Sequence, residues 1–174
     1  MSTPANRGWR GAIAWAFTAF QPESPFALLD PSGQRLTFDR ADDIAAAIRA
    51  HDLPPTPEFV VKAKVRPLVI LQDRPRGALA EFAALKLARF TKLRPEDQQR
   101  VRDGQDRALF YLAHNKSKYG LAQENAVDLN SLVRVHRSAI VTRPVGWLDL
   151  NEIDVLGRRL ADFLDIDLGP AIRE

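Results

Sequence analysis

An arginine and a histidine with the spacing of strand neighbours are the first residues that suggest chemistry. Arg134 and His136 lie two positions apart within 131–141, where valines and an isoleucine recur as in a β-strand. Side chains two apart on a strand point to the same face. Histidine titrates near neutral pH and suits general acid–base catalysis, whereas arginine stays charged and binds phosphate oxygens. A solvated polar strand face is the simpler alternative, because Arg137 and Ser138 follow directly.

Metal and thiol chemistry have little support in the sequence. The three histidines, His51, His114 and His136, lie far apart and form neither an HxxxH nor an HExxH motif. There is no cysteine, which excludes disulfide bonds and thiolate metal sites. We therefore expect no metal and no cofactor. A chain without disulfides also fits a cytoplasmic location.

The overall composition is that of a globular protein with a basic net charge. The 174 residues suit a single domain, and a hydrophobic fraction of 45% is enough to form a core. The formal net charge is +3. A basic balance favours nucleic acid as a partner, although many basic proteins have no such role.

The first half of the chain reads as strands around one short helix. Aromatic and β-prone residues predict a strand over 12–20. Two shorter strands, 26–29 and 34–38, flank the turn sequence Asp30-Pro-Ser-Gly33 and predict a hairpin. A helix over 40–50 is indicated by apolar residues four positions apart.

The second half continues with strands and ends in a helix. The region 94–107 is charged, contains Pro95 and Gly104, and predicts a solvated loop that includes one helical turn. Asp149 and Glu152 form a capping-box start for an amphipathic helix, which Gly169-Pro170 should end. Strands without βαβ alternation favour a mainly β fold with helices (α+β), built as a small barrel. The strands expected here are 65–71, 84–91, 109–113 and 131–141.

The N-terminal apolar run resembles a signal peptide only faintly. Arg7 and Arg10 precede the apolar residues 11–20, but Thr18 interrupts them and no small-residue cleavage site follows. A buried first strand explains the run better. No other segment approaches the roughly 20 apolar residues of a membrane span, so we expect no membrane contact.

Three segments, in this order, resemble the MazF/PemK-like toxins. Arg10-Gly-Ala-Ile-Ala-Trp15 is similar to the opening strand of that family, and Lys64-Val-Arg-Pro-Leu-Val-Ile70 to its hallmark Arg-Pro before a buried strand. The stretch from Asp128 to Leu168, with Val145-Gly-Trp-Leu148, is similar to its closing strand and helix. The resemblance implies one SH3-like domain over 1–174, with a C-terminal helix. It does not cover 21–58, which we expect to be an insertion carrying the hairpin and helix.

The resemblance also implies an activity. The family cleaves single-stranded RNA without a metal, as the toxin of a type II toxin–antitoxin system. Such an endoribonuclease needs a base for the ribose 2′-hydroxyl, an acid for the leaving 5′-oxygen and cations for the charged phosphorane. The same resemblance implies a cytoplasmic homodimer whose groove is blocked by an antitoxin peptide.

Four residues match the functional positions of the family. Arg66 matches the hallmark arginine. Thr91 matches the threonine of a Pro-x-Thr-Ser/Thr element, although Ala88-Arg-Phe-Thr-Lys92 lacks the proline and the second hydroxyl. Arg134-Val-His136 lies where PemK-like toxins carry Arg-x-Asp as their acid and base. We therefore expect Arg66, Thr91, Arg134 and His136 to form one catalytic face.

Further cations are candidates for binding RNA. Arg89 and Lys92 flank Thr91 and can replace the missing hydroxyl in holding phosphate. Lys116 and Lys118 lie in the polar segment 115–120, where plain solvation explains them equally well.

Two other functions compete with the ribonuclease. A catalytically inactive SH3-like module that binds a protein or nucleic acid is favoured by the altered Thr91 element and by the unmatched segment 21–58. A toxin acting on a protein target such as a gyrase is the third possibility, because a related toxin family shares this barrel. That toxin would bind through the C-terminal helix and cleave no RNA.

Overall fold

The computed structural model describes residues 8–19, 24–55, 57–75 and 80–166. It divides the chain into two compact units. The main unit comprises Met1–Phe17 and Val65–Glu174, and the inserted unit comprises Thr18–Lys64.

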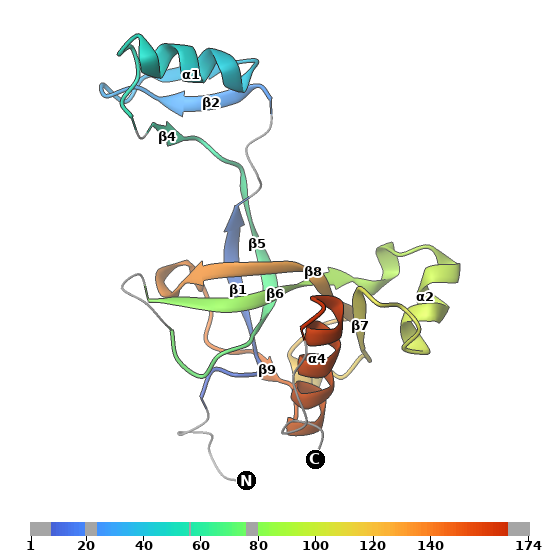
Figure 1. Ribbon diagram of the computed structural model, residues 1–174. Coiled ribbons are helices and arrows are strands. Elements are labelled where there is room, and N and C mark those ends of the chain that lie inside the picture. Colours follow the sequence, from blue (N-terminus) through green and yellow to red (C-terminus); the bar gives the residue numbers. More distant parts are fainter. Residues whose placement is uncertain (1–7, 20–23, 56, 76–79, 167–174) are drawn as a thin grey trace. The chain divides into compact units, whose positions relative to one another are not determined.

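The main unit is built on a six-stranded sheet with the order β7-β8-β6-β5-β1-β9 (Figure 1). Its registered strand pairs are antiparallel. The mixed α+β class is therefore confirmed. In the described part of the chain the sheet does not close on itself, since β7 and β9 form its edges, so the SH3-like barrel is not confirmed. The strands are β1 (Ala12–Ala19), β5 (Ala63–Ile70), β6 (Glu81–Arg89), β7 (Leu109–Leu112), β8 (Asn125–His136) and β9 (Gly146–Trp147).

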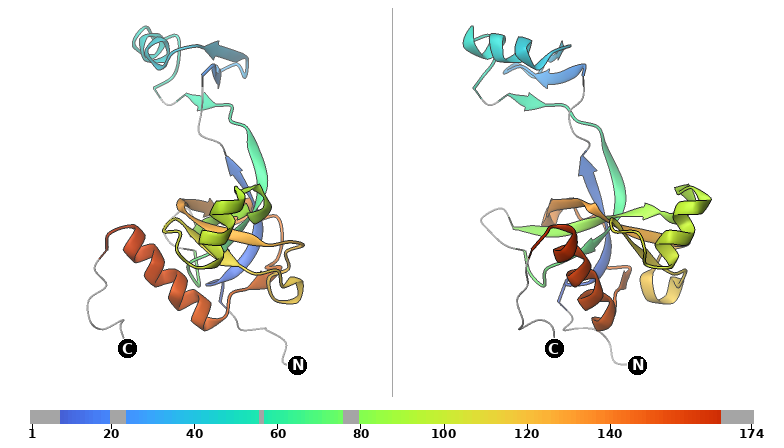
Figure 2. Two further views of the ribbon diagram at one scale, coloured as in Figure 1. Left: turned by 90° about the vertical axis from the view of Figure 1, so that its right-hand side faces the viewer. Right: turned by 45° about the vertical axis from the view of Figure 1, so that its right-hand side comes forward.

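Helix α4 (Leu150–Phe163) covers one face of this sheet (Figure 2). Its predicted capping box is confirmed: the Asp149 side chain accepts from the Glu152 N–H, and Glu152 accepts from the Asp149 N–H. The helix ends before the predicted stop at Gly169-Pro170, which lies outside the described residues.

The predicted loop over 94–107 is wrong, because α2 (Pro95–Arg102) occupies its first half. Proline at the first helical position needs no hydrogen-bond donor and already has a helical φ. Acidic residues in the first turn and arginines in the last turn match the helix dipole. Three shorter elements complete the unit: the 3₁₀ turns η1 (Phe90–Lys92) and η2 (Arg137–Ala139), and the one-turn helix α3 (Lys116–Tyr119).

Strand β8 contains a large bulge where it pairs with β6. Leu85 pairs with Leu132, but the next residue, Lys86, pairs with Asp128. Four steps along β8 therefore match one step along β6, which leaves three extra residues in β8. The prediction of a strand over 131–141 covered only its second half, and the strand ends at His136. Because three is odd, the bulge exchanges the faces of odd- and even-numbered residues in β8.

The two faces of the sheet carry different cores. On the α4 face, Val69, Leu85 and Val127 pack with Leu156 of α4. On the other face, here called the Phe82 face, Leu68 and Ile70 of β5 pack with residues of β1, β6 and β8. The strand members on this second face are Ala12, Ala16, Leu68, Ile70, Phe82, Ala84 and Val135.

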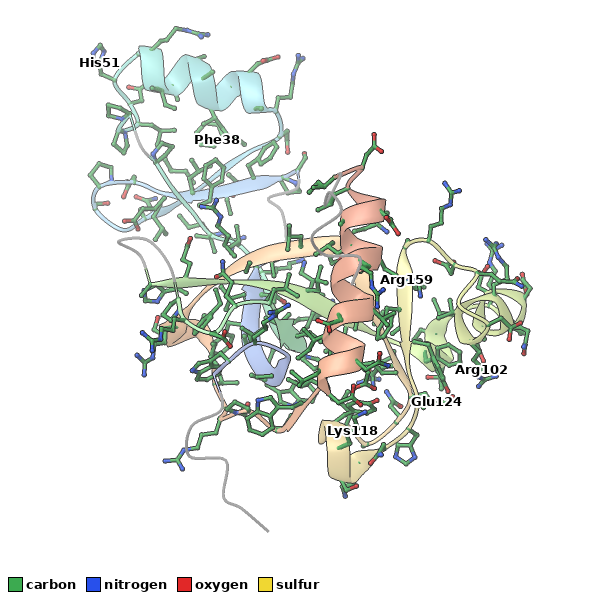
Figure 3. The ribbon with its side chains drawn as sticks, turned by 60° about the horizontal axis from the view of Figure 1, so that its bottom comes forward. Phe38, His51, Arg102, Lys118, Glu124 and Arg159 are labelled. Carbon is green, nitrogen blue, oxygen red and sulfur yellow. The ribbon has the colours of Figure 1, made fainter. Side chains whose placement is uncertain are left out.

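The inserted unit has its own small sheet and core. The sheet has the order β3-β2-β4, with β2 (Phe26–Leu29), β3 (Arg35–Phe38) and β4 (Glu58–Phe59). The predicted hairpin is confirmed by β2 and β3, and the predicted helix by α1 (Ala41–Arg49). Leu28, Ile44 and Leu53 form the core, and Phe38 packs against it (Figure 3).

Candidate functional site

Arg66 and Thr91 come to the same end of the main sheet. Strands β5 and β6 are antiparallel, with Leu68 opposite Lys86. Arg66 is the fourth of the eight residues of β5, and Thr91 lies in η1, directly after β6 ends. Antiparallel pairing places the first half of one strand beside the second half of the next, so both residues lie toward the same end of the β5–β6 pair.

Arg66 points to the Phe82 face and is joined there by two residues that sequence reasoning missed. Arg66 precedes Leu68 by two positions in β5, so it shares the face of Leu68. Lys86 lies directly opposite Leu68, and Asp128 lies directly opposite Lys86. Residues paired across antiparallel strands point to the same side. Arg66, Lys86 and Asp128 therefore share one face, and all three are half-buried.

The predicted RNA-binding residues Arg89 and Lys92 flank Thr91, and all three side chains are exposed. Between them the Phe90 ring is fully buried, in a core with Val101 and Ala126. Burial of this one ring fixes the 3₁₀ turn, so the polar neighbours of Phe90 face solvent. The structure thus presents two cations and one hydroxyl from a single anchored turn.

A polar network of α2, β7 and the residue before β8 adjoins the same turn. The Arg102 guanidinium donates to Glu124 at 3.0 Å and lies 4.7 Å from the centroid of the Phe90 ring (Figure 3). The Tyr111 hydroxyl donates to the second Glu124 carboxylate oxygen. The hydrogen bond from Tyr111, with that from Arg102, lowers the pKa of Glu124 below its usual range despite partial burial. Burial and the bond to Glu124 raise the pKa of Tyr111.

Arg134 and His136 lie at the opposite end of β6, so the prediction of one catalytic face for all four residues is wrong. Arg134 pairs with Ala83 and His136 with Glu81, at the beginning of β6. Ala83 is six residues, or about 20 Å, from Arg89, where the strand ends.

The faces differ as well. Val135 belongs to the core of the Phe82 face, so its neighbours Arg134 and His136 point to the α4 face. The two remain neighbours on one face, as predicted, but they point away from the face of Arg66.

Arg134 and His136 have partners of their own. The Arg134 guanidinium lies 3.9 Å from a Glu81 carboxylate oxygen, with 84% of its side chain exposed. His136 Nδ1 lies 2.6 Å from the Ser138 hydroxyl oxygen. An open hollow of about 580 Å³ adjoins Arg134. It is lined by Gln72, Glu81, Phe82, Ala83, Leu132, Val133 and Arg134.

The two predicted lysines of the polar segment differ in their surroundings. Lys118 forms ion pairs with Asp149 at 2.7 Å and Glu152 at 2.8 Å. Burial alone would lower the pKa of Lys118, but the hydrogen bonds to these carboxylates outweigh it and raise that pKa. Lys118 therefore connects α3 to the start of α4, and its ammonium group is engaged. Lys116, on the same short helix, is exposed.

Weak signals for the missed residues exist in the sequence. Lys86 is a charged residue between Leu85 and Leu87, and the interior of its strand is otherwise apolar. The spacing of Asp128 and Ser131 suits a local side-chain hydrogen bond. Neither signal assigns a role to its residue. Lys86 and Asp128 become neighbours only through the pairing of β6 with β8, which local sequence does not reveal.

Among the described residues there is neither a cluster of metal ligands nor a helix that could span a membrane. No three histidine or carboxylate side chains gather there as metal ligands would. None of the helices in the described ranges has the length and apolar character that a membrane crossing requires.

Comparisons with known proteins assign no function to this chain. No family model matches the chain, and no curated protein sequence matches it significantly.

Proposed function

We propose that this protein is a metal-independent endoribonuclease that cleaves single-stranded RNA, as the toxin of a type II toxin–antitoxin system. The observation that carries the proposal is the position of Arg66 and Thr91 toward the same end of the main sheet. These are two residues that the resemblance to MazF/PemK-like toxins marks as functional. Exposed Arg89 and Lys92 beside Thr91 provide cations where an RNA backbone would pass.

The residues at this end suit the chemistry of RNA cleavage. Attack of the ribose 2′-oxygen on phosphorus increases the negative charge on the phosphate oxygens. The Arg66 guanidinium binds such oxygens in pairs and stays charged throughout. The Thr91 hydroxyl can donate to the same phosphate. Arg134 and His136 have no part in this step within one chain, because they lie at the other end of β6.

The cellular setting of the proposal follows from the same resemblance. We propose a cytoplasmic homodimer whose RNA groove is blocked by an antitoxin peptide. An acidic peptide would compete with RNA for Arg89 and Lys92, since both ligands are anionic.

Incubating the purified protein with single-stranded RNA in the presence of EDTA tests the activity. We expect cleavage into fragments with 2′,3′-cyclic phosphate and 5′-hydroxyl ends, and growth arrest when the gene is induced in bacteria. Arg66→Gln should lower kcat/KM by about 10²-fold or more, as loss of a transition-state donor does. Intact RNA together with normal growth would refute the proposal.

One observation favours a second function, a non-catalytic module that binds RNA or protein. The Arg134 and His136 pair, the best acid–base candidate in the sequence, lies away from Arg66 and Thr91. This alternative predicts that the wild-type protein binds single-stranded RNA or a protein partner and cleaves no RNA.

A further inference from the structure

We propose that Lys86 is a second catalytic cation, which binds the scissile phosphate together with Arg66. The inference rests on the proposed ribonuclease function and adds a residue that the family resemblance does not mark. Three features of the Phe82 face carry it: the position of Lys86, the bulge opposite it and the hydrogen bonds of Asp128.

The position of Lys86 allows its ammonium group to meet the Arg66 guanidinium. Lys86 lies directly across from Leu68, and Arg66 is the next residue of β5 on that face. Successive same-face positions are about 7 Å apart along a strand, a span that two long cationic side chains can bridge. One phosphate between them would receive both charges.

The bulge in β8 explains why Lys86 has no carboxylate partner. Asp128 is its cross-strand neighbour, but the Asp128 side chain accepts hydrogen bonds from residues of the bulge. One carboxylate oxygen accepts from the Asn130 N–H at 3.0 Å, and the other accepts from the Ser131 hydroxyl at 2.5 Å. Within the described part of the chain, the Lys86 side chain forms no hydrogen bond or ion pair.

A half-buried lysine side chain without an acidic partner can bind an anion at its ammonium group. Such a pair is stronger where neighbouring protein atoms displace water. A phosphodiester is such an anion, and it would place the ammonium group where charge develops during cleavage. Bulges re-aim side chains in this way beside active sites.

Lys86 acts electrostatically and keeps its proton throughout the step. The ribose 2′-oxygen forms a bond to phosphorus while the bond from phosphorus to the 5′-oxygen breaks. The 2′-hydroxyl proton passes to water, and the 5′-oxygen takes a proton from water. Lys86 and Arg66 hold the non-bridging phosphate oxygens, which carry the added charge.

Cleavage and binding by two substituted proteins test the assignment. Lys86→Met keeps the length of the side chain without its charge, and Lys86→Arg restores the charge. We expect Lys86→Met to lower kcat by about 10²-fold. A 2′-O-methyl RNA cannot be cleaved and measures binding alone. For this RNA, Lys86→Met should reduce the slope of log binding constant against log salt concentration by about 0.7. Lys86→Arg should recover most of kcat and of this slope. Lys62 is an exposed lysine of the inserted unit, so Lys62→Met should change neither quantity.

A measurement on the wild-type protein guards against misfolding of the variants. Acylation of surface amines, followed by mass spectrometry, reports the exposure of each lysine. The 2′-O-methyl RNA should protect Lys86 from acylation and leave Lys62 reactive. Equal labelling of Lys86 with and without RNA would overturn the assignment.

The outcomes separate this inference from the proposed function. If the wild type cleaves RNA and Lys86→Met cleaves equally well, the role of Lys86 is refuted and the ribonuclease stands. The wild type could instead leave RNA intact but bind it with a salt dependence that Lys86→Met reduces. This result would refute the ribonuclease and support the contact between Lys86 and phosphate. If RNA is neither bound nor cleaved, both are refuted.

Discussion

Lys86 lies directly opposite Asp128 on neighbouring antiparallel strands, yet the Asp128 carboxylate accepts hydrogen bonds from its own strand. Opposite charges in this arrangement commonly pair and stabilise a sheet. Here Asp128 closes the bulge, and Lys86 is left for another anion. The bulge thus links the architecture of the sheet to the proposed phosphate site.

Asp128→Ala should destabilise the main unit, because the Asn130 N–H and the Ser131 hydroxyl lose their acceptor. Loss of the two bonds should cost about 2 kcal/mol of unfolding free energy, measured by urea denaturation. Asp154→Ala, at an exposed position of α4, is the matched control and should change it by less than about 0.5 kcal/mol. Equal stability of the two variants would show that Asp128 does not hold the bulge.

Glu124→Gln should flatten the acid limb of the stability curve. Folding lowers the pKa of Glu124 from 4.5, chiefly through the hydrogen bond from Tyr111. A carboxylate whose pKa falls on folding stabilises the native state above its unfolded pKa, and this stabilisation is lost as pH falls through the folded pKa. The wild type should therefore lose stability below about pH 4.5 more steeply than the variant.

Thermal unfolding at a series of pH values measures this difference. Glu58→Gln, at an exposed position in the inserted unit, serves as the control and should keep the wild-type slope. If Glu124→Gln follows the wild-type curve over the whole acid range, the network with Arg102 and Tyr111 contributes nothing to stability.

The order of the elements was largely predictable from the sequence, but their register was not. Arg66 and Thr91 could be placed at the same end because local patterns predict two adjacent strands, and antiparallel pairing sets the start of the first beside the end of the second. The separation of Arg134 from Arg66 depends on how β8 pairs with β6, and no local pattern contains that pairing. The odd number of extra residues in the bulge also decides which face Asp128 shares.

Helix α2 shows a different limit of sequence reasoning. Pro95 and Gly104 suggested a loop because both residues break helices in the interior. Here they lie just inside the start and just beyond the end, where each is favourable. The positions of Pro95 and Gly104 relative to the helix ends, and not their residue types, determine that a helix forms here.

Asp149→Ala should loosen the attachment of α4. The Asp149 side chain caps the helix through the Glu152 N–H and also binds Lys118. Loss of an N-cap costs about 1 kcal/mol, which hydrogen exchange at the first turn of α4 would report. Asp149→Ser keeps the cap and removes only the ion pair, so it should retain most of the protection. Equal loss in both variants would assign the effect to Lys118 instead of the cap.

His136→Gln should leave the pH dependence of RNA cleavage unchanged. His136 lies opposite Glu81, eight residues or about 26 Å along β6 from Arg89, where the strand ends, and it points away from the face of Arg66. A histidine so placed can neither accept nor donate the protons of the reacting ribose within one chain. Measuring kcat/KM from pH 5 to pH 9 for the wild type and the variant tests this expectation.

Loss of one limb of the pH profile in His136→Gln would contradict the single-chain site. It would also indicate that a second copy of the chain supplies the histidine. In that case, a mixture of Arg66→Gln and His136→Gln should cleave faster than either variant alone, because a mixed dimer contains one complete site. No recovery on mixing would instead trace the effect of His136 to the fold of its own strand end, where it contacts Ser138.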